Sequence, residues 1–109
     1  MKRLFSLFLV VAAVCSSVSV AGANTPLHRI HRREVTQRAR IRAGWRQGDL
    51  TRGERSHLRH GQAHVRRMTY RARRDGHISQ YERRRIARAQ DRQSRRIYRL
   101  RHNHRERSL

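Results

Sequence analysis

Arginine side chains are the most abundant groups in this chain that could bind a ligand. The sequence has 28 Lys and Arg residues against 7 Asp and Glu, which gives a formal net charge of +21. A guanidinium is planar and donates hydrogen bonds in a fixed fork that suits phosphate and carboxylate oxygens. Arginines that are adjacent in the sequence are the residues we predict to bind polyanions: Arg66, Arg67, Arg73, Arg74, Arg83, Arg84, Arg85, Arg95 and Arg96.

Histidines form the second group of candidate ligands. His57, His60 and His64 are spaced i, i+3, i+7, so they share one face of a helix. Neutral imidazoles at this spacing can bind zinc, copper or nickel. The alternative is that they belong to a solvated polar face, where nearby arginines repel any cation. A transition metal at these three residues is therefore an alternative prediction to polyanion binding.

The segment from Asp75 to Glu82 resembles the second half of an EF-hand calcium loop, with a central glycine, an aliphatic residue and a closing glutamate. Calcium needs several oxygen ligands, most of them from the first half of such a loop. Here those early positions fall on Arg71 and Arg73, which repel the ion. We therefore do not expect calcium as a cofactor.

Catalysis has little support in the sequence. It shows neither a serine in a nucleophile-elbow context nor a glycine-rich phosphate loop nor a pair of carboxylates suited to acid–base work. We expect no enzyme and no cofactor. No motif for reading nucleic acid accompanies the basic charge, so sequence-specific nucleic-acid binding is not expected either.

Two short loops of one pattern organise the elements that carry these residues. They are Gly48–Glu54 and Gly76–Glu82, which start 28 residues apart and suggest a duplicated helix–loop unit. Each has a glycine, where the backbone can turn left-handed, and then a capping box in which a hydroxyl and a glutamate satisfy the first backbone N–H groups of a helix. The predicted cap residues are Thr51 with Glu54, and Ser79 with Glu82.

The loops divide the chain into three predicted helices. The first begins at Thr25, with Pro26 in the first helical position, and ends near Ala43–Gly44. The second spans 52–72 and the third 80–101. We also expect Glu34 and Arg38 to pair along the first helix, because residues four apart are neighbours on a helix surface.

Each predicted helix has a narrow apolar stripe at three- and four-residue spacing. The stripe residues are Leu27, Ile30, Ile41 and Trp45; Leu58, Gly61, Val65, Met68 and Ala72; and Ile86, Ala89, Gln93, Ile97 and Leu100. After residue 23 the chain has only 12 Leu, Ile and Val residues and no Phe (5 Leu, 5 Ile, 2 Val). We therefore predict an all-α, marginally stable fold of three helices joined by tight glycine-containing loops. The alternative is self-association, with the second and third helices packed against another copy.

The first residues have the pattern of a secretory signal peptide. Lys2 and Arg3 precede an apolar run from Leu4 to Val14, and Ala21-Gly22-Ala23 is a small-x-small cleavage site. The alternative is an uncleaved membrane anchor. Cleavage would remove Cys15, so the mature chain would have no cysteine and no transmembrane segment. The predicted organisation is a signal peptide at 1–23, a helical domain at 24–101 and a disordered basic tail at 102–109.

The motifs resemble those of small exported bacterial proteins of uncharacterised function. That family has a G-x-L-T-x-x-E segment, a D-G-x-I-S-x-x-E segment and a final S-x-x-I-Y-R, which correspond here to Gly48–Glu54, Asp75–Glu82 and Ser94–Arg99. The resemblance implies an exported helical protein and no particular activity. Leu50-Thr51 also gives a weaker likeness to periplasmic stress chaperones with an L-T-x-x-Q motif, although Glu54 replaces the glutamine.

Charge and the predicted export together give the expected function. We expect a periplasmic or secreted protein that binds anionic envelope components, such as lipid headgroups or phosphates of lipopolysaccharide, or an acidic protein partner. The alternative is a periplasmic metal-binding or stress-chaperone-like protein that uses its surface histidines.

Overall fold

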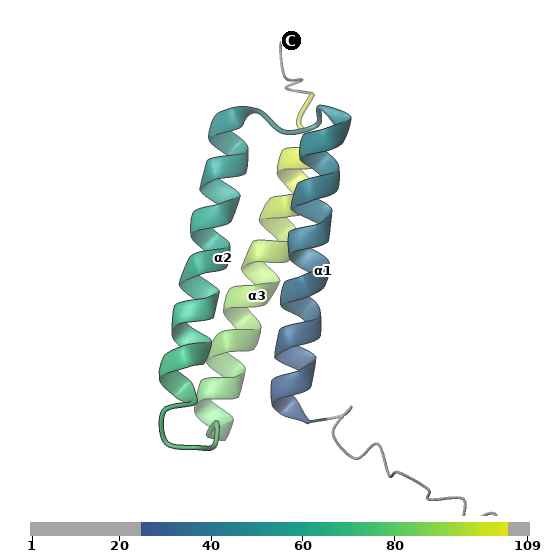
Figure 1. Cartoon of the computed structure of the whole chain (residues 1–109). Helices are drawn as coiled ribbons and strands as arrows, with labels where there is room; N and C mark the ends of the chain where they lie inside the picture. The colour runs from purple at the N-terminus through teal and green to yellow at the C-terminus, as the bar shows by residue number, and fades with distance from the viewer. Residues whose placement is uncertain (1–24, 105–109) are drawn as a thin grey trace, which may run out of the picture.

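Three helices make up the fold. The computed structural model describes residues 25–104 and contains α1 (Pro26–Gln47), α2 (Arg52–Ala72) and α3 (Gln80–Arg101), which run up, down and up in Figure 1. The all-α prediction is confirmed, and the second and third helices have the predicted bounds. The predicted signal peptide at 1–23 and residues 105–109 of the predicted tail lie outside the described residues.

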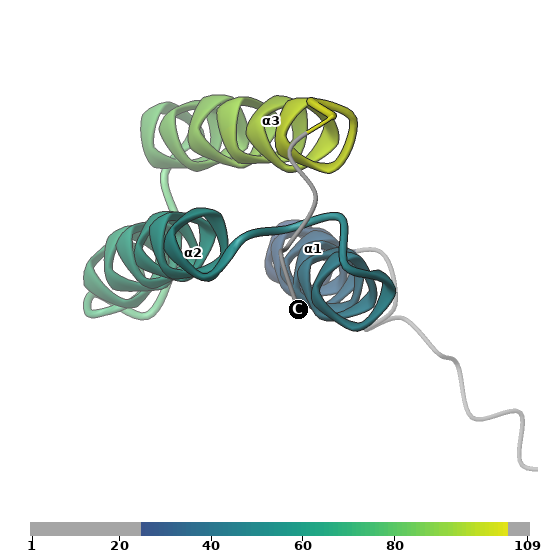
Figure 2. The same ribbon diagram turned by 90° about the horizontal axis from the view of Figure 1, so that it is seen from above.

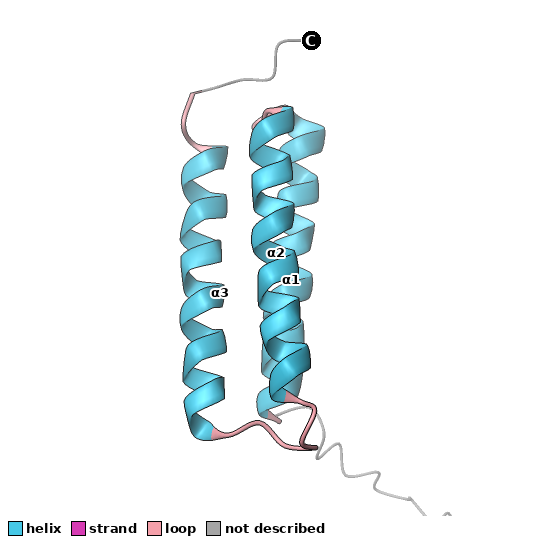
Figure 3. Cartoon of the chain, turned by 90° about the vertical axis from the view of Figure 1, so that its left-hand side faces the viewer, coloured by secondary structure: helices cyan, strands magenta, loops and turns pink. Residues whose placement is uncertain are grey.

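The helices form two layers. Viewed from above, α1 and α2 lie side by side and α3 forms a second layer that runs across both (Figure 2). The side view also shows α3 apart from α1 and α2 (Figure 3). Contacts of α3 with each of the other helices are more extensive than those between α1 and α2. Two adjoining depressions lined by the α1 and α2 segments, and by no residue of α3, form a groove between these two helices. Within residues 25–104, no helix is both long and apolar enough to cross a membrane.

Both predicted capping boxes are present. The Thr51 hydroxyl accepts from the Glu54 N–H at 3.2 Å, and the Glu54 carboxylate accepts from the Thr51 N–H at 2.9 Å. Ser79 and Glu82 make the same two bonds at 3.2 and 2.9 Å. These pairs satisfy backbone donors that would otherwise lack a partner at the start of α2 and α3. Leu50, next to the first box, is fully buried and ties that loop to the core.

The end of α1 differs from the prediction. The helix continues past Ala43–Gly44 to Gln47 and stops at Gly48, whose φ of 84° is left-handed and whose N–H donates to the Trp45 carbonyl. Gly44 is instead a buried helical residue, and a Cβ there would lie 3.0 Å from the Arg101 side chain. Gly44 thus leaves room for the Arg101 side chain at the end of α3, and Gly48 ends the helix.

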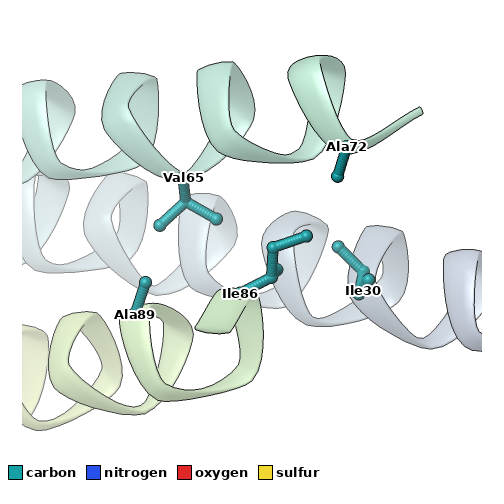
Figure 4. Close-up of a cluster of buried hydrophobic side chains, with 5 residues drawn as sticks. All are labelled: Ile30, Val65, Ala72, Ile86 and Ala89. Atoms are coloured by element: carbon teal, nitrogen blue, oxygen red, sulfur yellow. The ribbon is translucent and has the colours of Figure 1, made fainter. Parts of the chain in front are cut away.

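The apolar core consists of two separate clusters. The first joins all three helices near the N-terminus of α1 (Figure 4) and contains Ile30, Val65, Ala72, Ile86 and Ala89. The second lies near the other end of the bundle and contains Ile41, Leu50, Leu58 and Ile97. The predicted stripes therefore supply the core, although neither cluster is large. This agrees with the small number of aliphatic residues in the sequence.

A layer of buried glutamines separates the two clusters. Its members are Gln37 from α1, Gln62 from α2, and Gln90 and Gln93 from α3, each no more than 3% exposed. Gln90 donates to the Ile30 carbonyl at 2.9 Å, and Gln93 to the Leu58 carbonyl at 2.8 Å. Gln37 donates to the Gln90 carbonyl at 2.8 Å, and Gln62 to the Gln37 side-chain oxygen at 3.0 Å. Every pair of helices is therefore linked by at least one glutamine.

The 28-residue repeat extends further than the two loops. Each helix has a buried aliphatic residue followed four positions later by a buried polar residue, at the same phase of the period: Ile30 and Glu34, Leu58 and Gln62, and Ile86 and Gln90. The repeat thus includes α1, which has no capping box of this pattern. All three helices therefore have the same pattern on their buried face, an aliphatic residue followed four positions later by a polar one.

Gly61 lets α2 approach α3 closely at the glutamine layer. A Cβ at this position would overlap Gln93 Oε1 and lie 2.8 Å from Gln93 Cδ. Gly61→Ala should lower the free energy of unfolding by about 1–3 kcal/mol, because the Gln93 amide must leave its bond to Leu58. Gly53→Ala, in the same helix with nothing within 4 Å, is the matched control.

Gly53→Ala should be neutral or stabilising by up to about 1 kcal/mol, since alanine has the higher helix propensity. Urea unfolding followed by circular dichroism measures both variants. If Gly61→Ala is as stable as Gly53→Ala, the close packing of α2 on Gln93 is contradicted.

We expect the stability of the fold to depend on pH through the cap residue Glu82. Hydrogen bonds from the Ser79 backbone N–H and hydroxyl, with a smaller effect of the His77 charge, hold the pKa of Glu82 below its ordinary value of 4.5. A lowered folded-state pKa stabilises the fold above the unfolded value, and this contribution is lost as the pH falls through the folded value. The Tm difference between the natural chain and Glu82→Gln should therefore shrink as the pH is lowered from 7 to 3. A difference that is constant over this range would contradict the ionised cap.

Candidate functional site

Arginines cover all three helices. Between the described residues three arginines have carboxylate partners: Arg33 with Asp91, Arg66 with Glu34, and Arg101 with Asp49. Asp49 accepts from Arg101 at 3.0 Å, whereas the Glu34–Arg66 distance is 3.9 Å. The predicted pairing of Glu34 with Arg38 is wrong, because Glu34 is buried on the side facing α2 and Arg38 is exposed.

The predicted polyanion-binding arginines do not form one surface. Arg73 and Arg83 line a depression beside the loop between α2 and α3, and Arg83 also donates to the Ile78 carbonyl at 2.8 Å. Arg95 and Arg96 lie about three turns further along α3. Pairs that are adjacent in the sequence point in different directions on a helix, about 100° apart, so adjacency does not gather their charges at one place.

The α1–α2 groove gathers a different set of arginines. Its arginine-lined part has a volume of about 310 Å³ and is formed by Arg38, Ile41, Arg42, Arg55, Arg59, Gln62 and Arg66. Arg38 and Arg42 are four residues apart on α1, and Arg55 and Arg59 are four residues apart on α2. Residues at this spacing share a helix face, so two rows of guanidinium groups line the groove from its two sides.

Sequence reasoning missed four of these five arginines, because it selected runs of adjacent residues. Only Arg66 belongs to the predicted set. The signal that was present in the sequence is the i, i+4 spacing of single arginines in two consecutive helices. Their meeting across one groove depends on the helix packing, which the spacing does not reveal.

A more apolar cavity continues from this groove toward the start of α1. It has a volume of about 570 Å³, and its lining includes Leu27, Ile30 and Tyr70 together with Glu34 and Arg66. Arg66 lines both the apolar and the arginine-lined part of the groove, so it marks their junction, and Glu34 lies 3.9 Å from it. Trp45 lies at the far end of α1. The Arg55 guanidinium stacks over its ring, 4.5 Å from the ring centroid.

His57, His60 and His64 are exposed on α2, and the Nδ1 atom of His60 lies 2.9 Å from the Ser56 carbonyl. In the part of the chain that the structure describes, no three His, Cys, Asp or Glu side chains are grouped to hold a metal ion. Metal binding through these histidines stays a prediction. A zinc titration that is unchanged in the His57→Ala, His60→Ala, His64→Ala triple variant would exclude this site.

The calcium-like segment is used for other purposes in the structure. Gly76 has a left-handed φ of 84° within the loop, and the closing glutamate, Glu82, accepts hydrogen bonds from Ser79 as a helix cap. The predicted tail also has structure at its start. His102 stacks on Tyr98 with ring centroids 4.3 Å apart, and Asn103 donates to Glu54 at 2.7 Å.

Comparisons of the chain with protein-family models, with curated proteins and with solved structures give no match.

Proposed function

We propose that this is an exported, arginine-rich helical protein that binds anionic components of the bacterial envelope or an acidic partner. The observation that carries the proposal is the small number of internal partners for its charge. Between the described residues three arginines pair with carboxylates, and the guanidinium groups of most others extend from all three helices into solvent. These groups are available to phosphate and carboxylate oxygens.

The apolar clusters and the glutamine layer support the same proposal, because they form a folded core that keeps the arginines on the surface. They bury residues from all three helices, so the fold has an internal core and the charged side chains lie on its surface. A chain with so large a net charge repels itself. An anion that binds the folded state relieves this repulsion and stabilises the fold by mass action.

The test uses the full chain with polyphosphate and with phosphatidylcholine vesicles that contain phosphatidylglycerol. Both should bind and raise Tm, and binding should weaken steeply as salt rises, because screening and counter-ion release both oppose it. Vesicles of phosphatidylcholine alone are the control. Binding that is unchanged between low and high salt, or equal for both vesicle types, would contradict the proposal. Export is tested separately by the mass of the chain recovered outside the bacterial cytoplasm, which should begin at Asn24.

A further inference from the structure

We propose that the arginine-lined part of the α1–α2 groove is a discrete binding site for a protonated phosphate group, either free phosphate or a phosphate monoester. The inference rests on the proposed function and narrows it from general attraction of polyanions to one place and one ligand chemistry. Two independent observations carry it. One is the facing rows of arginines, and the other is a buried glutamine oxygen that has no hydrogen-bond partner.

The arginine rows provide the charge. Arg38 and Arg42 come from α1, and Arg55 and Arg59 come from α2, so a ligand in the groove is reached from both sides. Arg55 is held in place by its stacking on Trp45. Guanidinium groups that face one another repel, and an anion between them replaces this repulsion with charge-assisted hydrogen bonds. Between the described residues, the carboxylate that pairs with an arginine of this lining is Glu34, 3.9 Å from Arg66 at one end.

Gln62 provides the selectivity for a ligand that carries a hydroxyl group. It lines the groove, is 2% exposed, and donates its amide N–H to Gln37. Among the described residues its Oε1 is the one buried side-chain nitrogen or oxygen without a hydrogen-bond partner. This oxygen is closed to solvent, so a ligand in the groove bonds it only after a side chain of the lining moves aside. A buried carbonyl oxygen without a partner is destabilising, and it can only accept a hydrogen bond.

The ligand must therefore offer two kinds of group. Arginines only donate, so the ligand needs anionic oxygens, and Gln62 only accepts here, so the ligand needs a hydroxyl. A phosphate or phosphate monoester that retains one proton has both. Sulfate has nearly the same shape and carries no proton at neutral pH, so it satisfies the arginines and leaves Gln62 Oε1 without a partner.

The adjoining apolar cavity defines two sources for such a phosphate. It shares Arg66 with the arginine-lined part, and its lining includes Leu27, Ile30 and Tyr70. A lipid with a phosphate monoester headgroup would place its apolar portion there, whereas free phosphate would leave that cavity unused.

The experiment is a calorimetric titration of the full chain with inorganic phosphate and with sulfate, at pH 7 and equal ionic strength. Phosphate should bind about tenfold more tightly than sulfate, the effect of one hydrogen bond at a buried acceptor. Arg38→Gln with Arg42→Gln should weaken phosphate binding by roughly tenfold or more. Arg88→Gln with Arg92→Gln is the matched control. Those two arginines have the same spacing and exposure on α3 and line none of the cavities described above, so their loss should leave phosphate affinity within about twofold.

Gln62→Met keeps the length of the side chain and removes the acceptor, so it should abolish the preference for phosphate over sulfate. If this variant does not fold, as judged by circular dichroism, the arginine pairs still decide the matter. Equal affinities for phosphate and sulfate would contradict the proposed site. Equal losses of phosphate affinity in the Arg38, Arg42 and the Arg88, Arg92 double variants would contradict it as well. If polyphosphate and anionic vesicles still bind in that case, general polyanion binding stands and only the discrete site fails. If neither they nor phosphate bind, both proposals fail.

The source of the phosphate is decided by competition. Phosphatidylcholine vesicles that contain phosphatidic acid, a lipid phosphate monoester, are added to the chain saturated with inorganic phosphate. Displacement of the bound phosphate by these vesicles, and not by vesicles of phosphatidylcholine alone, assigns the site to a lipid headgroup. Vesicles that leave the bound phosphate in place assign it to free phosphate.

Discussion

Hydrogen bonds from four buried glutamines set the spacing of the three helices. Gln90 and Gln93 reach backbone carbonyls of α1 and α2, and Gln37 reaches one of α3. A carbonyl oxygen has two lone pairs, so it can accept such a bond while it keeps its bond within the helix. The two apolar clusters on either side are too small to define the packing in detail. The glutamine layer fixes the register of the helices and, with Gly61, their distance from one another.

The same layer links the core to the charged surface. Gln62 donates inward to Gln37 on α1, which holds α1 and α2 at a fixed separation, and it also lines the groove between them. The arginine rows on the two helices are therefore held opposite each other, in spite of their repulsion, by hydrogen bonds beneath them. In a chain with a net charge of +21, this places like charges together where a ligand can neutralise them.

Local rules predicted most of the fold. The bounds of α2 and α3 and both capping boxes follow from a hydroxyl three residues before a glutamate, because this pattern acts within one helical turn. The end of α1, which was predicted three residues too early, could not be found from local sequence rules. Gly44 and Gly48 look alike in the sequence, and only the approach of Arg101 shows that Gly44 belongs to the packing. The candidate groove could not be predicted for the same reason, since Arg38 and Arg59 meet only through tertiary contacts.

The most direct test of the account is a two-dimensional ¹H–¹⁵N spectrum of the chain during a titration with phosphate. The account predicts saturable shifts of the Gln62 side-chain amide and of the backbone around Arg38, Arg42, Arg55 and Arg59, with the outer face of α3 nearly unmoved. Shifts spread evenly over the arginine-rich faces of all three helices, with the Gln62 amide unchanged, would contradict it. That result would mean that the glutamine layer organises the fold and the anion attraction has no defined site.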